Sequence, residues 1–356
     1  MNRLALLALL ALAPACDNST GTNGVDYTPL LTTLTDTVAV PGITLFTTDA
    51  DALVPALTTL STTPSAANLA AAQTAWRTVR ASWRKIDSVT SFGPAADELL
   101  PETIDASPAD GDGIDAVVTG TDALDAGYVA ALGNKKKGFL GLEHLLFSTA
   151  GNDTALQSLT GDGAPSRRRA LVVLMAQELQ SLAHTLASAW TTYATDVKTS
   201  GHGSARYPIQ KDAVTLYVGG TVSALEVVVG ARLATPLGRK AGSSGTPDPS
   251  LDPTSSSDSA VADMNASLAS VKAMWNAPGF SAYVTSTNIL ADANSYQDAC
   301  IAKVAAIPAP FATALTSAAQ PVQDAYAACK TWKLLWYSDL VHAIGSNPLI
   351  LDGDGD

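Results

Sequence analysis

The chain has 356 residues, with 21 Lys and Arg against 33 Asp and Glu, and a formal net charge of −12 at pH 7. An acidic surface of this kind repels phosphate, so the composition argues against nucleic acid as a partner. Hydrophobic residues make up 47% of the chain and aromatic residues only 6%. This balance favours helices packed through small side chains, and the length allows two domains of ordinary size or one large one.

The first 26 residues are typical of a targeting segment followed by a tether. Arg3 precedes an apolar run, and Ala13-Pro14-Ala15 stands directly before Cys16, which predicts a lipoprotein signal peptide over residues 1–16 with Cys16 as the lipidated residue. Ordinary cleavage beside Ala15 is the alternative. Residues 17–26 are polar and predict a flexible tether. No later run is expected to cross a membrane, so we expect a cell-envelope protein held by its lipid anchor alone, facing the periplasm or the cell surface.

The first long helices are predicted between Tyr27 and Asp87. Tyr27 to Leu60 is predicted as helix interrupted at Pro41-Gly42 and at Pro55, and Ser65 is a candidate cap for the next helix. The apolar residues of that next helix recur at alternating spacings of three and four, which is the pattern of a helical bundle: Leu69, Ala72, Trp76, Val79, Trp83 and Ile86. A basic stripe of Arg77, Arg80 and Arg84 runs beside them, either as partners of neighbouring carboxylates or as a binding surface.

The most unusual stretch is Gly138 to Phe147, which is apolar on every side except at Glu143 and His144. A helix that is apolar all round is buried. A carboxylate inside it is costly unless something pairs with it or binds through it. Gly138 and Gly141 have no side chains, so another helix or a ligand can approach the backbone there.

Further helices are predicted over Asp122 to Leu132, Lys135 to Ser148, Ala164 to Asp196, Pro208 to Leu233, Asp258 to Trp275, Thr285 to Ile307 and Pro321 to Ile344. Within the Pro208 helix, Glu226 lies in an apolar run much as Glu143 does, which suggests either two related halves or two separately buried glutamates. Residues 238–257 form a long loop rich in Gly, Ser and Pro. The pattern predicts an all-α chain of two up-and-down helical bundles packed side by side, over residues 27–205 and 206–356.

Cys300 and Cys329 are the only cysteines after Cys16. In an oxidising envelope they form either one disulfide or two buried free thiols. A hairpin turning at Pro308 to Pro310 would leave them out of register. A bond is expected only if Pro308 to Gln320 makes an irregular connection and the last helix starts at Pro321.

Several separated patches resemble the imelysin-like family of bacterial envelope proteins. Gly138 and Glu143 match the family pattern Gly-x-His-x-x-Glu, with Leu140 at the histidine position. The remaining patches are Trp76-Arg77 with Phe92-Gly93-Pro94, the Arg232 to Gly238 run and the Gly-Asp-Gly-Asp end. The family usually has a Glu-Ser pair in the loop, whose counterpart here is Asp252-Pro253. The resemblance implies an all-helical fold, a site where the two domains meet around the Glu143 helix, and a link to metal binding and iron acquisition.

On this basis we expect a non-catalytic protein that binds a metal ion, iron or calcium, or a small ligand. Carboxylates suit hard cations, and the candidate ligands are Glu143, Asp87, Asp263 and Glu226. Arg80, Arg84 and His144 are the candidate substrate-binding residues, although His144 points about 100° away from Glu143 on a helix. The opposing interpretation is that Glu143 is a buried carboxylate held by Arg80 or Arg84.

Two other functions remain open. The family is classified with metallopeptidases, but the sequence has no His-Glu-x-x-His motif and has Leu140 where the family histidine would stand, so catalysis is the weaker expectation. The remaining alternative is a metal-independent module that binds a peptide, polymer or partner protein in the groove between the two bundles, with the 238–257 loop.

Overall fold

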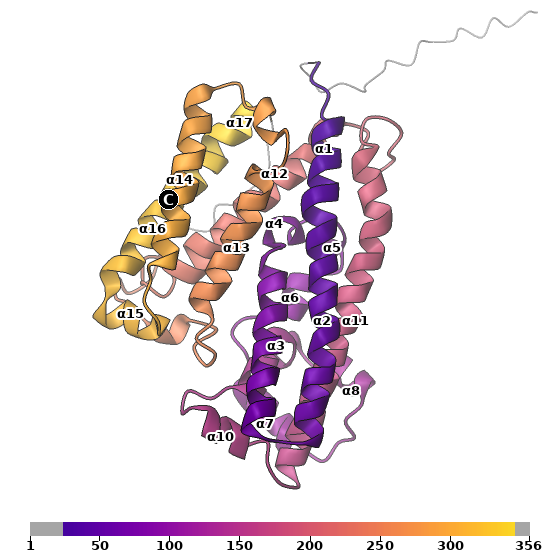
Figure 1. Cartoon of the computed structure of the whole chain (residues 1–356), viewed down its shortest axis with the longest axis vertical. Coiled ribbons are helices and arrows are strands. Elements are labelled where there is room, and N and C mark those ends of the chain that lie inside the picture. The colour runs from indigo at the N-terminus through magenta and orange to yellow at the C-terminus, as the bar shows by residue number, and fades with distance from the viewer. Residues whose placement is uncertain (1–23, 346–356) are drawn as a thin grey trace, which may run out of the picture.

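The structure is a computed structural model of the whole chain, and it describes residues 24–345. The predicted signal peptide, Cys16, most of the predicted tether and the acidic C-terminal end lie outside the described residues. Every regular element between residues 24 and 345 is a helix, so the predicted all-α class is confirmed (Figure 1).

The N-terminal part is built on three long helices, with α2 (Val40–Thr62) packed against both α3 (Ala66–Arg84) and α11 (Ala164–Lys198). Ser65 caps α3 as predicted, since its side chain accepts a hydrogen bond from the Asn68 N–H. The shorter elements of this part are α1 (Thr28–Leu34), η1 (Thr35–Ala39), α4 (Asp87–Thr90), α5 (Gly93–Asp97), α6 (Leu100–Ile104), α7 (Gly111–Thr119), α8 (Ala126–Ala130), η2 (Asn134–Lys136), α9 (Gly138–Leu146) and α10 (Asn152–Gln157).

The first helical stretch departs from the prediction at both prolines. A five-residue π-helical turn, η1, joins α1 to α2 without a break, and Pro41 follows it as the second residue of α2, so the backbone hydrogen-bond pattern widens just before the residue that lacks an N–H. Pro55 lies inside α2 without ending it. The predicted breaks are therefore wrong, because packing of α2 between α3 and α11 maintains the helix through a residue that would end an isolated one.

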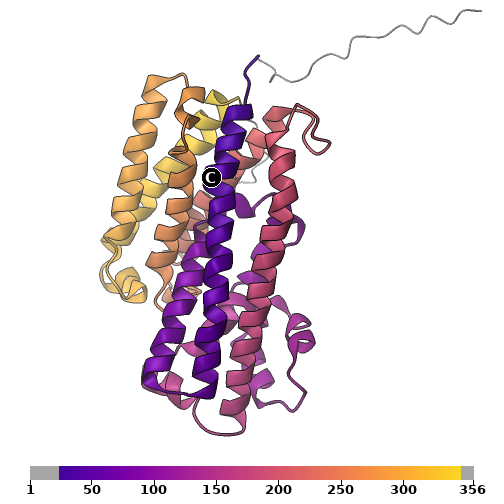
Figure 2. The ribbon, with the colours of Figure 1, turned by 45° about the vertical axis from the view of Figure 1, so that its right-hand side comes forward.

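The C-terminal part contains α12 (Gln210–Glu226), η3 (Val227–Ala234), η4 (Pro249–Leu251), α13 (Ala260–Trp275), η5 (Phe280–Tyr283), α14 (Thr287–Ala305), α15 (Phe311–Ser317), α16 (Ala319–Leu334), η6 (Leu335–Leu340) and α17 (Val341–Ala343). Helices α14 and α16 pack side by side (Figure 2). The Cys300–Cys329 disulfide joins them, with Cα atoms 4.6 Å apart. The short helix α15 between them takes up the chain length that a tight hairpin would leave out of register.

The two parts share one hydrophobic core. Helix α13 packs on α3, and α12 packs on α4. At the second contact a Cβ on Gly220 would lie only 2.1 Å from the Ser88 carbonyl oxygen, so this close approach requires glycine. The predicted boundary between residues 205 and 206 falls between α11 and α12, and the division into two domains stays a prediction.

Two helical stretches are long and apolar enough to cross a membrane by length and composition alone, Thr28–Thr62 and Gln210–Ala234. The expectation that no run would reach this length is therefore wrong. In the structure α2 lies against α3 and α11, and α12 lies against α4 and α13. A buried core helix has the same apolar character as a membrane span.

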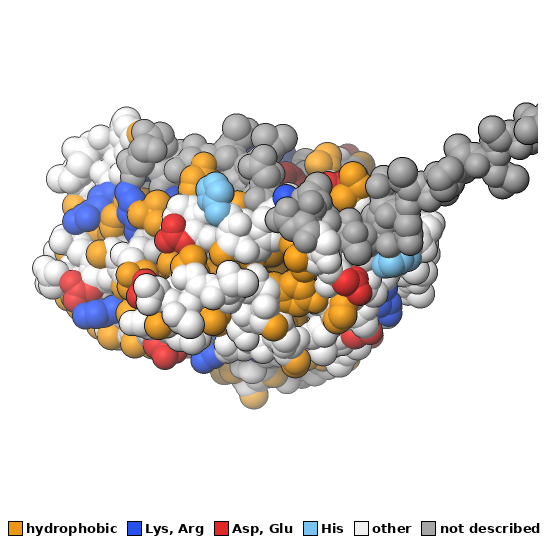
Figure 3. Space-filling model, turned by 90° about the horizontal axis from the view of Figure 1, so that it is seen from above, with side chains coloured by type: hydrophobic (Ala, Val, Ile, Leu, Met, Phe, Trp, Pro, Cys, Tyr) orange, Lys and Arg blue, Asp and Glu red, His pale blue; other side chains and the backbone are white. Residues whose placement is uncertain are grey.

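Charges of both signs are mixed on one end of the molecule (Figure 3). Seen from above, acidic and basic side chains are scattered among polar and hydrophobic ones (Figure 3). On this face they form no continuous basic stripe of the kind that follows a phosphate backbone.

Candidate functional site

Helix α9 carries the buried glutamate. Gly138 opens the helix with φ of +65°, and a Cβ there would lie 2.2 Å from the Ile104 carbonyl oxygen of α6. The expected close approach at this glycine is therefore confirmed, and the neighbour is a helix backbone. On the other side α3 fixes α9, since the Trp76 indole N–H donates to the Phe139 carbonyl oxygen at 3.1 Å.

Glu143 is 3% exposed, as the apolar character of its helix predicted. Its Oε1 accepts a hydrogen bond from the Ser257 backbone N–H at 2.8 Å, and its Oε2 is buried without a partner among the described residues. Burial raises the pKa of this carboxyl to about 7, against the opposing effect of Arg80. The sequence suggested an arginine as the partner of Glu143. In the structure the hydrogen bond to this carboxylate comes instead from a backbone N–H of the 238–257 loop.

Arg80 binds other carboxylates. Its Nε and Nη2 hold Asp263 through both carboxylate oxygens at 2.7–3.1 Å, and its Nη1 donates to Asp105 at 2.7 Å. The guanidinium also lies 5.4 Å from the Trp76 and Phe139 ring centroids. Burial opposes ionisation of Asp263, but Arg80, Arg232 and Arg84 together hold the pKa of its carboxyl below the usual value.

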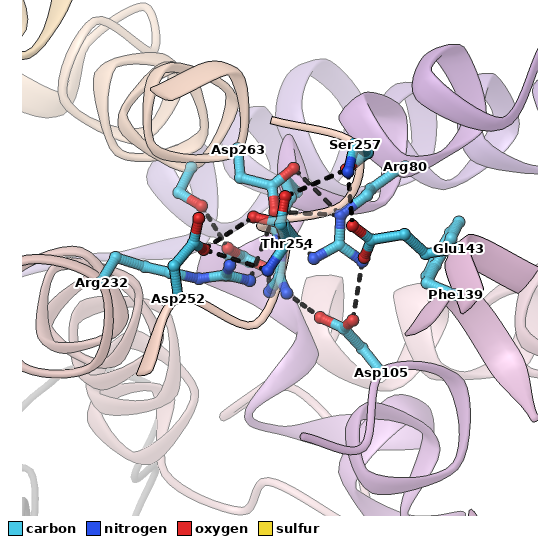
Figure 4. A network of polar contacts seen from close by, with 12 residues as sticks. Arg80, Asp105, Phe139, Glu143, Arg232, Asp252, Thr254, Ser257 and Asp263 are labelled. Carbon is cyan, nitrogen blue, oxygen red and sulfur yellow. Dashed lines mark hydrogen bonds and ion pairs between the residues drawn. The ribbon is translucent and has the colours of Figure 1, made fainter. Parts of the chain in front are cut away.

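Arg84 and Arg232 lie beside this pair. Arg84 contacts Asp105 and donates to Asp87 at 3.5 Å, while Arg232 approaches Asp263 at 3.3 Å. Burial lowers the pKa of Arg84 to about 10 and lowers that of Arg232. Burial also raises the pKa of Asp87, although Asp87 accepts a hydrogen bond from Ser267. Together these groups form what we call the charged cluster, shown in part in Figure 4: Arg80, Arg84, Asp87, Asp105, Glu143, Arg232, Asp252 and Asp263.

The end of the 238–257 loop closes over the charged cluster. Asp252 accepts hydrogen bonds from the Thr254 N–H and hydroxyl, both at 3.0 Å, and burial raises the pKa of its carboxyl. Arg77 donates to the Ser257 carbonyl oxygen at 3.1 Å. The loop residue that hydrogen-bonds to Glu143 is thus itself held by α3.

A cavity of about 740 Å³ opens beside the cluster. Its walls come from both parts of the chain, with Trp83 and Arg84 on α3, Leu140 on α9 and Arg232 on η3. The other lining residues are Asp87, Thr90, Ser91, Ala96, Leu99, Pro101, Glu102, Asp105, Ser107, Pro108, Ser223, Val227, Ala231, Thr235, Lys240, Ser250, Leu251 and Pro253. The volume is that of a small-molecule site.

The structure brings some of the predicted site residues together and leaves others apart. Asp87, Asp263, Arg80 and Arg84 belong to the same cluster as Glu143, as Figure 4 shows in part. The other two residues have partners elsewhere. His144 contacts Asp115 of α7 at 2.9 Å, and Glu226 pairs with Lys333 of α16 at 2.8 Å. Between residues 24 and 345 no group of three or more His, Cys, Asp or Glu side chains is arranged to hold a metal ion.

Sequence reasoning did not assign a site role to Asp105, Arg232 or Asp252. Arg232 carried a usable signal, since it is a charge inside the apolar run Val227–Ala234, the same feature that singled out Glu143. Asp105 lies just after the short helix α6, where no pattern distinguishes it from an exposed loop acid. Asp105 and Arg232 meet their partners, Arg80 and Asp263, across intervening helices, whereas the hydrogen bonds of Asp252 are local.

A protein-family model and a cyanobacterial protein both match long parts of the chain. A sequence model described as Imelysin (Peptidase_M75) matches residues 39–331. Iron-regulated protein A of Synechococcus elongatus is 31% identical over 208 residues, which are 57% of this chain and 53% of that protein, so the match spans about half of that relative's length.

Two crystal structures have a similar fold. An imelysin-like protein from Psychrobacter arcticum has a TM-score of 0.75 at 18% identity, over 95% of this chain and 99% of its own. A protein of Parabacteroides distasonis described as an iron-regulated protein A precursor has a TM-score of 0.73 at 18% identity, over 92% and 95%. At these identities the likeness shows the fold alone.

Proposed function

Because the chain belongs to the imelysin family, we propose that it is a non-catalytic binding protein of the cell envelope, linked to iron acquisition, whose ligand enters the cavity beside Glu143. Two similar proteins are named as iron-regulated. The N-terminal sequence and the word precursor in one of those names support secretion. Lipidation at Cys16 is part of the proposal, and Cys16→Ser should move the protein from the membrane fraction to the soluble fraction.

The main support for the proposal is the size and lining of the cavity. At about 740 Å³ it is far larger than a lone ion needs and falls within the usual range for small molecules. Leu140 lines it at the position of the family histidine, so at that point the wall offers an apolar surface. The site therefore suits iron carried in a complex better than a bare ion.

The charges of the cluster also disfavour a bare cation. Asp263 and Asp105 are held by arginines at 2.7 Å, and three guanidinium groups lie among the carboxylates. A cation entering there would face these positive charges and would compete with existing ion pairs.

Ligand binding is tested by thermal unfolding of the mature protein with ferric iron supplied in several chelates. A bound ligand at a hundred times its dissociation constant stabilises a protein by about 2.7 kcal/mol. Leu251 and Leu334 are both 46% exposed, and only Leu251 lines the cavity. Leu251→Trp should reduce the shift and Leu334→Trp should leave it unchanged. Equal shifts in both variants would place the ligand elsewhere.

Direct binding of a metal ion at Glu143 is the second candidate. Among Glu143, Asp87 and Asp263, only Glu143 keeps a buried carboxylate oxygen without a described partner, and such an oxygen suits a hard cation. Stabilisation by ferric or calcium ions that disappears in Glu143→Gln would support this candidate. An unchanged shift would count against it.

The metallopeptidase alternative stays a prediction. A zinc hydrolase needs several protein ligands and an open coordination position, and residues 24–345 offer no such group. Chelator-sensitive cleavage of a denatured substrate protein would support the alternative. The metal-independent binding module is supported instead if peptides or polymers stabilise the protein and no form of iron does.

A further inference from the structure

Two arginines on the cavity wall each have a buried N–H donor without a hydrogen-bond partner among the described residues. Arg84 is 8% exposed and Arg232 is 7% exposed, and each guanidinium carries several N–H donors. Arg232 donates no hydrogen bond with good geometry to any residue between 24 and 345, and its Nη1 is buried without a partner. Arg84 forms ion pairs with Asp105 through Nη2 and with Asp87 through Nη1, but its Nε has no hydrogen-bond partner within the same range.

Arg80 provides the contrast within the same cluster. Its Nε, Nη1 and Nη2 all donate to carboxylates at 2.7–3.1 Å, and it does not line the cavity. The satisfied arginine therefore lies behind the wall, and the two under-satisfied arginines form part of it. Buried donors without acceptors are costly, so two arginines that each keep one unpaired donor and also line a cavity favour a ligand that supplies acceptors to these guanidinium groups.

The buried acceptors without partners lie elsewhere. Glu143 Oε2 and Asp252 Oδ2 are the carboxylate oxygens without partners among the described buried groups, and neither residue lines the cavity. Glu143 and Asp252 appear on opposite sides of the cluster in Figure 4. Among the buried carboxylate and guanidinium groups of the cavity wall, those without a partner are thus donors, which select for an acceptor-bearing ligand.

We propose that Arg84 and Arg232 form a carboxylate-binding pair, and that the ligand of the cavity is an organic carboxylate, free or carrying ferric iron. A guanidinium matches the two oxygens of a carboxylate, and Lys240 adds a further cation to the cavity lining. Asp87, Glu102 and Asp105 also line the cavity, so a ligand without a carbon skeleton, such as phosphate, meets repulsion that no apolar contact offsets. Trp83, Leu140, Val227 and Leu251 provide apolar surface for the carbon skeleton.

This inference rests on the proposed function only in placing the ligand in the same cavity. The test is calorimetric titration of the mature protein with citrate, succinate, benzoate and inorganic phosphate, and with ferric citrate as a separate arm. We expect at least one carboxylate to bind and phosphate not to bind. Phosphate binding as tight as that of the carboxylates would overturn the assignment of ligand class.

Matched variants test the residues. Arg232→Gln and Arg239→Gln each remove one positive charge, and Arg239 is exposed and outside the cavity lining. Loss of charge-assisted hydrogen bonds should weaken carboxylate binding about tenfold or more in Arg232→Gln, and Arg239→Gln should bind as the unmodified protein does. Arg232→Lys keeps the charge and loses the planar fork, and it should fall between them.

The remaining outcomes separate the two proposals. Equal carboxylate affinity in all three variants would overturn the arginine pair. Stabilisation by ferric iron without any carboxylate binding would overturn the carboxylate inference and leave the iron-linked function standing. Failure of every carboxylate and every form of iron would overturn both. The titrations of unmodified protein decide the ligand class even if a variant fails to fold.

Discussion

The buried carboxyl of Glu143 should make stability depend on pH in a defined window. Its pKa rises from 4.5 to about 7 on folding, chiefly because burial disfavours the charged form. Between these values the native state binds more protons than the unfolded state, so the free energy of unfolding falls as pH rises. The contribution is complete below pH 4.5 and lost above about pH 7. At 1.36 kcal/mol per unit, it amounts to roughly 3 kcal/mol.

Glu143→Gln removes this titration and keeps an oxygen that can accept from the Ser257 N–H. We expect the variant to be more stable than the unmodified protein at pH 8, by up to about 3 kcal/mol, and the advantage to disappear at pH 4.5. Urea unfolding at several pH values between 4 and 8 measures both proteins, provided that each unfolds in one transition. The difference between the two proteins cancels the titration of groups that they share.

Glu98→Gln is the control, since Glu98 is exposed, and it should leave the pH dependence unchanged. A Glu143→Gln variant whose stability followed pH in parallel with the unmodified protein would refute the argument. It would mean that water or a neighbouring cation already satisfies the Glu143 carboxylate in the native state.

Other changes test the packing and the cross-links of the fold. Arg80→Met leaves two buried carboxylates without their main partner and should cost about 3–5 kcal/mol in urea unfolding; a loss below about 1 kcal/mol would contradict the network. Gly138→Ala places a Cβ against the backbone of α6 and should lower the free energy of unfolding by about 2 kcal/mol or more. Gly133→Ala is its control, because the space around its Cβ is open, and it should change stability by less than about 0.5 kcal/mol. Replacing Cys300 and Cys329 by serine opens a cross-link with a sequence separation of 29 and should cost about 3–4 kcal/mol; an unchanged thermal midpoint under non-reducing conditions would show that the bond does not constrain the chain.

The predictions that held depend on local periodicity. The apolar residues from Leu69 to Ile86, in α3 and just after it, are buried as predicted, and Ala164 begins the long helix α11. Glu143 was predicted to be buried because its helix has no polar face, and it is. Element boundaries were less well predicted: α8 covers only Ala126–Ala130 of the helix expected from Asp122.

The partners within the site were not predictable in the same way. The contact between Glu143 and Ser257 spans 114 positions, and that between Arg80 and Asp263 spans 183. The stripe of arginines on α3 looks uniform in the sequence, yet Arg80 is fully engaged and Arg84 lines the cavity. Only the packing of α9 and α13 on α3, with η3 against α13, separates these roles.

The sequence by itself determined that the chain folds into helices and that a charge is buried on the Gly138–Phe147 stretch, because helix periodicity and burial are properties of neighbouring residues. The tertiary structure alone decided which groups meet that charge and which donors face the cavity. An ion pair or hydrogen bond forms only within about 3–4 Å, and which distant segments come that close depends on how the helices pack.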